Sequence, residues 1–176
     1  MQTEQVILVN ELDEQHGISP KMHAHEQGLL HRAFSIFIFN KNGDMLLQQR
    51  ALDKYHGGGL WTNACCSHPR PGESLSEAAQ RRLEEEMGFT ARLEKIFDFV
   101  YRADVENGLV EHEFDHVFAG IYEGPVVINT SEVMNARYAS MQEISEVLEI
   151  EPAKYTTWFR LIFARVKEWH QLQKFN

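Results

Sequence analysis

The chain has 176 residues, of which 43% are hydrophobic and 24% charged, as expected for one ordinary globular domain rather than a disordered or fibrous protein. Its net charge of −9 argues against a nucleic-acid or membrane-surface partner held by a general basic field. No apolar run reaches the roughly 18–20 residues that span a bilayer, and the acidic N-terminus lacks a secretion signal, so we expect one cytoplasmic domain over residues 1–176.

The first part of the chain is predicted to alternate strands and loops. Residues 4–10 read as a short strand, and residues 11–32 as an ordered loop with one helical turn. Residues 33–39 (AFSIFIF) are apolar at almost every position, which is typical of a central strand buried on both faces. An Asn-Gly pair then turns the chain into residues 45–50, which indicates a hairpin.

A loop rich in Gly and Pro is expected over residues 51–72, interrupted by the brief extended segment WTNACC. A helix follows from Ser74 to Met87 and is closed by Gly88, because glycine readily adopts the left-handed conformation that ends helices.

The last part of the chain carries two more predicted strands and two helices. Residues 92–104 and 109–120 are strand-like runs around a second Asn-Gly pair, the strongest short hairpin signal in the chain. Residues 135–139 add a strand and 140–149 a short helix, and residues 154–172 have aromatic and aliphatic side chains at helical spacing. Mixed strands with helices beside them indicate an α+β fold, layered α/β/α.

The helix at 74–87 has two charges on its apolar side. At about 100° per residue, the apolar positions from Leu75 to Met87 lie on one arc, and Arg82 and Glu86 fall within it. Burying a lone charge is costly. The pair is therefore either an ion pair at the edge of the core or part of a site for a metal or an anion, and the second interpretation is favoured by the Gly/Pro loop that precedes the helix.

Carboxylates also gather on one predicted strand. Glu111, Glu113 and Asp115 are spaced by two, so they project from one face and repel one another unless they are solvated or bind a cation. A solvated face is the common arrangement. The nine histidines of the chain are weak signals singly, and the spacing of His25 and His31 matches no standard zinc motif.

The loop and helix resemble the Nudix box, Gly-x5-Glu-x7-Arg-Glu-x-x-Glu-Glu-x-Gly. Serine stands where the family has the first Gly, and arginine stands where the hydrolases have the first Glu of the helix. The loss of that metal-binding carboxylate argues against hydrolysis, which needs a metal-activated water, whereas arginine binds phosphate. The matching positions are Ser67, Glu73, Arg81, Arg82, Glu85, Glu86 and Gly88.

A wider resemblance covers nearly the whole chain. The segments RAFSIFIFN, QQRALDK, LWTNACCSHPRPGES, AAQRRLEEEMG, YRAD and GLVEHE occur in this order, and together they are similar to type I isopentenyl-diphosphate delta-isomerases. The resemblance implies a Nudix-type mixed sheet between helices. It also implies conversion of isopentenyl diphosphate to dimethylallyl diphosphate through a carbocation-like intermediate, by protonation of one carbon and deprotonation of another.

The resemblance assigns site residues as well. Cys66 and Glu113 match the proton-transfer pair, Tyr101 a tyrosine that hydrogen-bonds beside it, and Trp158 a tryptophan whose ring stabilises positive charge. Without the resemblance, Trp158 reads as a core residue of its amphipathic helix and Cys66 as a small buried hydrophobic residue. Cys65 receives no role.

The resemblance implies two kinds of metal and a set of cations. A tightly bound Mn²⁺, Mg²⁺, Fe²⁺ or Zn²⁺ would be held by His25, His31, His68, Glu111 and Glu113. Glu86 would help to hold a Mg²⁺ that bridges the substrate diphosphate. The diphosphate itself would be contacted by Lys21, Arg50, Lys54 and Arg82. The other six histidines are expected to have ordinary surface or hydrogen-bonding roles.

Two alternatives remain open from the residues. The first is a Nudix-type diphosphate hydrolase, and the second is a silent metal- or nucleotide-binding module, in which Cys66 and Glu113 could be replaced without consequence. The expected partner is a small isoprenoid diphosphate, with no nucleic acid or membrane, and the expected assembly is a monomer or a weak homo-oligomer.

Overall fold

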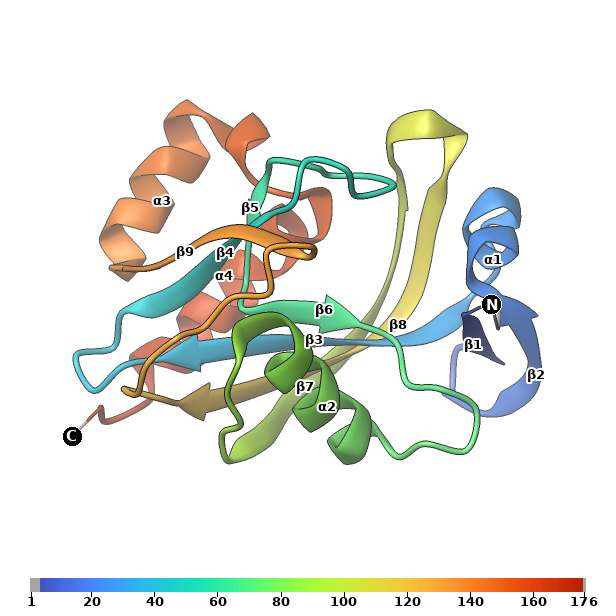
Figure 1. Cartoon of the computed structure of the whole chain (residues 1–176), viewed down its shortest axis with the longest axis horizontal. Coiled ribbons are helices and arrows are strands. Elements are labelled where there is room, and N and C mark those ends of the chain that lie inside the picture. The colour runs from blue at the N-terminus through green and yellow to red at the C-terminus, as the bar shows by residue number, and fades with distance from the viewer. Residues whose placement is uncertain (1–3, 176) are drawn as a thin grey trace.

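The computed structural model describes residues 4–175, and within them nine strands form one mixed sheet accompanied by four α-helices (Figure 1). The strands are β1 (Gln5–Val9), β2 (Gln15–Pro20), β3 (His31–Phe39), β4 (Met45–Arg50), β5 (Trp61–Thr62), β6 (Cys65–Ser67), β7 (Leu93–Asp104), β8 (Val110–Ile121) and β9 (Val133–Ala139). The helices are α1 (Lys21–Gln27), α2 (Leu75–Met87), α3 (Met141–Ile150) and α4 (Thr157–Gln171).

Strand β3 is the centre of the sheet. Along one edge it pairs in parallel with β8, from His31 opposite Glu113 to Phe39 opposite Ile121. Along its other edge, successive parts of β3 pair with β1, then β6 and then β4, and all three pairings are antiparallel. The predicted hairpin at 45–50 therefore reduces to one pair of residues, Phe39 with Met45, after which β4 leaves β3 to pair with β5 and β9.

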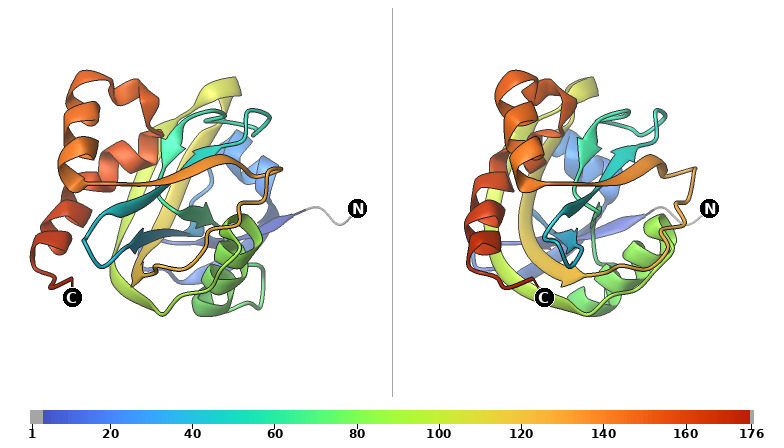
Figure 2. Two further views of the ribbon diagram at one scale, coloured as in Figure 1. Left: turned by 60° about the vertical axis from the view of Figure 1, so that its left-hand side comes forward. Right: turned by 90° about the vertical axis from the view of Figure 1, so that its left-hand side faces the viewer.

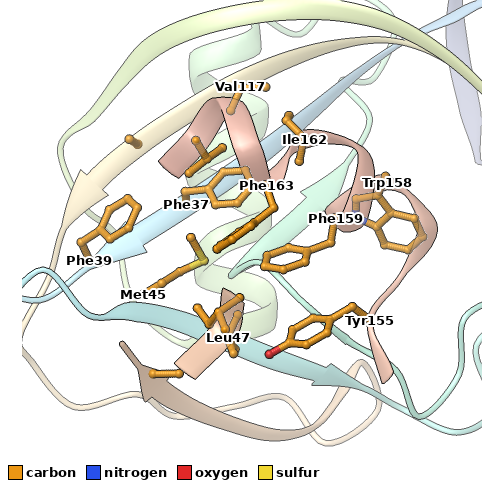
Figure 3. Packing of buried hydrophobic residues seen from close by; sticks show 14 of the residues in the cluster. Phe37, Phe39, Met45, Leu47, Val117, Tyr155, Trp158, Phe159, Ile162 and Phe163 are labelled. Carbon is orange, nitrogen blue, oxygen red and sulfur yellow. The ribbon is translucent and has the colours of Figure 1, made fainter. Parts of the chain in front are cut away.

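Side chains of β3 alternate between two hydrophobic layers, because successive residues of a strand point to opposite faces. Phe34, Ile36 and Ile38 pack on the side of α2, whereas Phe37 and Phe39 pack on the side of α3 and α4. Figure 2 shows α2 and the C-terminal helices on opposite sides of the sheet, and Figure 3 shows the aromatic packing beneath α4. This arrangement confirms the predicted α/β/α layering. No helix in the described part of the chain is long and apolar enough to cross a membrane.

Helix α2 has local signals at both ends. Ser74 caps its N-terminus: the Ser74 hydroxyl accepts from the Glu77 backbone N–H, and the Glu77 carboxylate accepts from the Ser74 backbone N–H. At the other end, Gly88 has φ +76° and donates its N–H to the Glu84 carbonyl. The helix therefore lies where the sequence predicts it, immediately after the loop that carries Cys66 and His68.

We expect Gly88→Ala to destabilise the chain more than Gly72→Ala. Both glycines have positive φ, so an alanine at either position costs about 1–2 kcal/mol of backbone strain. At Gly88 the new Cβ would also lie 2.4 Å from the Val127 carbonyl oxygen, whereas at Gly72 it would meet no described atom within 4 Å. Urea unfolding of the two variants measures the difference, and equal losses would show that the Val127 contact is not restrictive.

Two predictions for short segments are wrong. Residues 11–32 are not a loop with one helical turn, because they contain the edge strand β2 and the seven-residue helix α1. Neither has a clear apolar period: β2 is mostly exposed and is ordered by pairing with β1. The C-terminal helix begins at Thr157, after a short 3₁₀ turn at Pro152–Lys154, so Tyr155 lies outside it.

Candidate functional site

The candidate site lies on the face of the sheet that points toward α4. Strand register brings its residues together: His31 and Tyr101 both lie opposite Glu113, and Ser35 lies opposite Cys66. Because alternate residues share a face, the odd-numbered positions of β3 and β8 point to the same side. The polar site residues thus lie on the same face of the sheet as Phe37 and its apolar neighbours, nearer the other end of the strands.

Four buried residues gather donor atoms suited to a metal ion. One donor atom from each of His25, His31, His68 and Glu113 lies within 4.8 Å of the others. The Nδ1 atoms of His25 and His31 each lie 2.8 Å from a backbone carbonyl oxygen, of Lys21 and Leu29 respectively. A carbonyl can only accept, so both Nδ1 atoms carry the proton and both Nε2 lone pairs are free.

The surroundings of these donors fit a divalent cation. The buried Nε2 of His25 has no hydrogen-bond partner within residues 4–175, and His68 Nε2 lies 3.2 Å from His31 Nε2 and 2.9 Å from Glu113 Oε1. Burial lowers the pKa of His68 to about 4. Burial of Glu113 opposes its ionisation, yet its contacts with the His31 and His68 side chains hold its pKa well below the usual range. Neutral imidazoles with one carboxylate can hold a divalent metal.

Glu111 is not part of this donor group. Its carboxylate lies 3.2 Å from the Tyr101 hydroxyl oxygen and 3.2 Å from His56 Nε2. The Tyr101 hydroxyl is closer to Glu113, at 2.8 Å, and with a single proton it donates fully to only one of the two carboxylates. Burial and the negative charge of Glu113 raise the pKa of Glu111 well above its usual range.

The three carboxylates on β8 do not form a solvated face. Glu111, Glu113 and Asp115 are 4%, 8% and 1% exposed, so the solvated arrangement that is common for such strands does not apply here. Asp115 accepts a hydrogen bond from the Ser35 hydroxyl at 2.7 Å. Burial raises its pKa well above the usual range, and the charge on Glu113 adds to the effect.

Cys66 lies on β6, directly beside Ser35 of β3, and lines the same cavity. Its Sγ lies 3.2 Å from Asn63 Oδ1, 3.1 Å from Trp158 Nε1 and 3.5 Å from the Ser35 hydroxyl oxygen. Burial raises the pKa of the Cys66 thiol to about 12, with a further contribution from Asp115, so the thiol is protonated at neutral pH. Cys65 points to the opposite layer and is fully buried in the core beside α2.

Cys66, Glu113, Tyr101 and Trp158 line one cavity of about 30 Å³, which has room for roughly one water molecule. Trp158 also belongs to the apolar cluster beneath α4 (Figure 3), so this residue both packs in the core and lines the cavity. The guanidinium carbon of Arg50 lies 5.1 Å from the Trp158 ring centre, which shows that the face of this ring can accommodate a cation.

His56 is a residue of this cavity that sequence reasoning assigned to an ordinary role. It is 4% exposed, its ring meets the edge of Trp158 at 87° with centres 5.7 Å apart, and burial lowers its pKa to about 3. Its neighbour Tyr55 also lines the cavity. The only local signal is the Gly triplet that follows, which allows a loop to turn inward but does not indicate where it goes.

A second group of residues provides cations beside α2. Lys54 and Arg82 both pair with Glu132, and Lys21 pairs with Glu4 at 3.1 Å. Burial lowers the pKa of Lys21, and repulsion by Lys54 and Arg82 contributes, so the three cations lie near one another. Glu4 and Glu132 were not predicted, because a lone exposed-looking carboxylate carries no local signal.

Of the two charges on the apolar arc of α2, Glu86 is buried and Arg82 is half-buried. Glu86 is 5% exposed, and it accepts hydrogen bonds from Arg82 and, at 2.9 Å, from the Gln48 side chain. Arg82 also donates to Glu85 at 2.7 Å. The two side chains form the ion pair at the edge of the core that was one of the two interpretations, and Gln48 of β4 is a further partner that the sequence did not reveal.

Comparison with known proteins finds relatives that match this chain along nearly its whole length. Residues 29–159 match the family described as NUDIX domain. An Isopentenyl-diphosphate Delta-isomerase of Pectobacterium atrosepticum is 46% identical over 170 residues, covering 97% of this chain and 95% of the relative. A protein of the same name from Burkholderia multivorans is 50% identical over 162 residues, covering 92% of each chain.

A solved structure supports the fold independently. The crystal structure of DR0079 from Deinococcus radiodurans superposes with a TM-score of 0.75 and covers 92% of this chain and 98% of that one. Its sequence is 16% identical, so the likeness concerns the arrangement of strands and helices and not the chemistry of the site.

Proposed function

This chain belongs to the isopentenyl-diphosphate Delta-isomerase family, on a Nudix fold, and we propose that the cavity between β6, β8 and α4 interconverts isopentenyl diphosphate and dimethylallyl diphosphate. The observation that supports this most directly is that a protonated thiol on Cys66 and an ionised carboxylate on Glu113 line the same cavity. Moving a double bond by one carbon requires one group that gives a proton and one that takes a proton.

The remaining residues of the cavity suit a cation-like intermediate. The Trp158 ring lines the cavity beside Cys66, and a desolvated aromatic face stabilises positive charge by ~2 kcal/mol. Tyr101 donates to Glu113 and thereby orients its carboxylate.

We assign the donor group formed by His25 of α1, His31 of β3, His68 just after β6 and Glu113 of β8 to a divalent metal. Such a metal, whether Mn²⁺, Mg²⁺, Fe²⁺ or Zn²⁺, would fix the Glu113 carboxylate and offset its charge. Family resemblance adds Glu111 as a fifth ligand. Its carboxylate would have to turn away from Tyr101 and His56 to join the four donors.

The diphosphate of the substrate would bind through Lys21, Arg50, Lys54 and Arg82. A diphosphate would compete with the carboxylates of Glu4 and Glu132, which Lys21, Lys54 and Arg82 contact, whereas Arg50 donates to the His56 carbonyl at 3.0 Å. Glu86, buried beside Arg82, is the carboxylate that we propose for a Mg²⁺ bridging the diphosphate. A small isoprenoid diphosphate is thus the proposed partner of a monomeric or weakly associating cytoplasmic chain.

Incubation with isopentenyl diphosphate and Mg²⁺ in D₂O tests the function. We expect dimethylallyl diphosphate with deuterium in a methyl group and no release of phosphate. Nuclear magnetic resonance monitors the product. A Nudix hydrolase would instead release inorganic phosphate or pyrophosphate without an allylic product, and a silent binding module would leave the substrate unchanged. Either result would exclude isomerisation as the activity of this chain.

We expect Arg82→Gln to raise the KM for isopentenyl diphosphate by about 10- to 100-fold, because a charged hydrogen bond contributes about 1.5–3 kcal/mol. Arg81→Gln is the matched control. Arg81 pairs with Glu73 and Glu85 instead, so its replacement should lower stability and leave KM within about twofold. Steady-state kinetics on both variants distinguish a phosphate contact from a general loss of positive charge on α2, which would raise both KM values alike.

A further inference from the structure

Asn63 has no role in the activity proposed above, although it belongs to the WTN segment that precedes Cys66. It lies between β5 and β6 and is fully buried. All of its side-chain polar atoms have partners among the described residues, as is normal for buried polar groups, and one of these partners is the Cys66 thiol.

The orientation of the Asn63 amide follows from its backbone partners. Its Nδ2 lies 3.0 Å from the Ile36 carbonyl oxygen and 2.9 Å from the Cys65 carbonyl oxygen. Carbonyl oxygens only accept hydrogen bonds, so the NH₂ group must face them. Oδ1 then faces the other way, toward the Thr62 hydroxyl at 2.9 Å and Cys66 Sγ at 3.2 Å.

This orientation determines where the thiol proton of Cys66 points. Asn63 Oδ1 can only accept, so Cys66 must be the donor between them, and Trp158 Nε1–H can only donate, so the sulfur must accept from it at 3.1 Å. The Ser35 hydroxyl, at 3.5 Å, is a weaker partner, because its own proton is donated to Asp115 at 2.7 Å.

We propose that Asn63 is a positioning residue for the isomerisation. Its Oδ1 accepts a hydrogen bond from the Cys66 thiol while Trp158 Nε1–H donates to the sulfur, and together these two contacts fix the direction of the S–H bond. The inference rests on the proposed role of Cys66. Thr156 donates to Thr62 at 3.0 Å, and Thr62 donates to the same Asn63 oxygen. A chain of hydrogen bonds thereby ties the start of α4, which carries Trp158, to the segment that carries the thiol.

Infrared spectroscopy of the S–H stretch measures this hydrogen bond directly. The chain has two cysteines, so Cys65→Ala leaves Cys66 as the only source of the band. In that background, Asn63→Ala should move the band to higher frequency because the acceptor is lost. Its kcat should fall about tenfold or more with KM within twofold, because a misdirected proton slows the chemical step and not binding.

Two further variants make the test decisive. Thr62→Val removes the competing donor to Asn63 Oδ1, so the band should move to lower frequency, and this variant serves if Asn63→Ala does not fold. Ser35→Ala is the control and should leave the band unchanged. An unmoved band in both the Asn63 and Thr62 variants overturns the proposal, as does a moved band in Asn63→Ala with an unchanged kcat. A wild-type chain that makes no allylic product overturns the proposed function instead, and the band still reports the orientation of the thiol.

Discussion

Cys66→Ala is expected to lower turnover of isopentenyl diphosphate by roughly 10⁴-fold, the upper end of what a positioned acid or base contributes. The substitution removes the thiol that lines the cavity and leaves the backbone pairing of β6 with β3 in place. Only weak sulfur hydrogen bonds to Asn63 and Trp158 are lost, so the fold should persist. Formation of dimethylallyl diphosphate measures the first effect, and circular dichroism with thermal unfolding measures the second.

Cys65→Ala is the matched control for this variant. Cys65 is the neighbouring residue but faces the core beside α2, because adjacent residues of a strand point to opposite sides. We expect it to lower the free energy of unfolding by about 1 kcal/mol and to leave turnover normal. Near-normal turnover in Cys66→Ala would remove the thiol from the mechanism, and equal losses in both variants would point to a general packing defect.

Glu113→Gln should have a comparably large effect, for two separable reasons. The carboxylate is proposed both as a metal ligand and as one partner in proton transfer, and an amide does neither well. We expect turnover below detection and at least a tenfold loss of tightly bound metal. Elemental analysis of the purified chain reports metal content, and product formation at saturating added metal reports the proton-transfer role separately.

The neighbouring His112 provides the comparison for Glu113. It lies on the other face of β8, where its Nδ1 hydrogen-bonds the Gly28 carbonyl at 2.9 Å. His112→Ala should keep its metal and its turnover. If Glu113→Gln retained both, the donor group of three histidines and one carboxylate would not be the metal site. Retained metal with lost turnover would confine Glu113 to proton transfer.

Periodicity alone predicts two parts of the site, and the family resemblance supplied the rest. A period of two along β8 places Glu111, Glu113 and Asp115 on one face, and the structure confirms this. The helical period of α2 places Arg82 and Glu86 on its apolar side, where the structure has Glu86 buried and Arg82 half-buried beside it. Such predictions succeed because they depend only on backbone geometry that every strand or helix shares.

The remaining features depend on contacts between distant segments. His56 reaches the cavity because its loop folds inward against Trp158 on α4, and no local pattern encodes that approach. Glu111 and Glu113 share a face, but the register of β8 against β3 sets Glu113, and not Glu111, opposite His31. The helix α1 was missed because seven residues are too few to show a helical period.

The alternation along β3 also limits how this sequence can change in evolution. His31 and Ser35 face the cavity only because an even number of steps separates them from each other and from Phe37. A single-residue insertion between His31 and Ser35 would turn His31 toward the other layer and separate it from the other histidines. Insertions in the turn before β3 therefore keep the alternation of the strand. Insertions or deletions within β3 would be removed by selection unless they involved an even number of residues or were absorbed by a bulge.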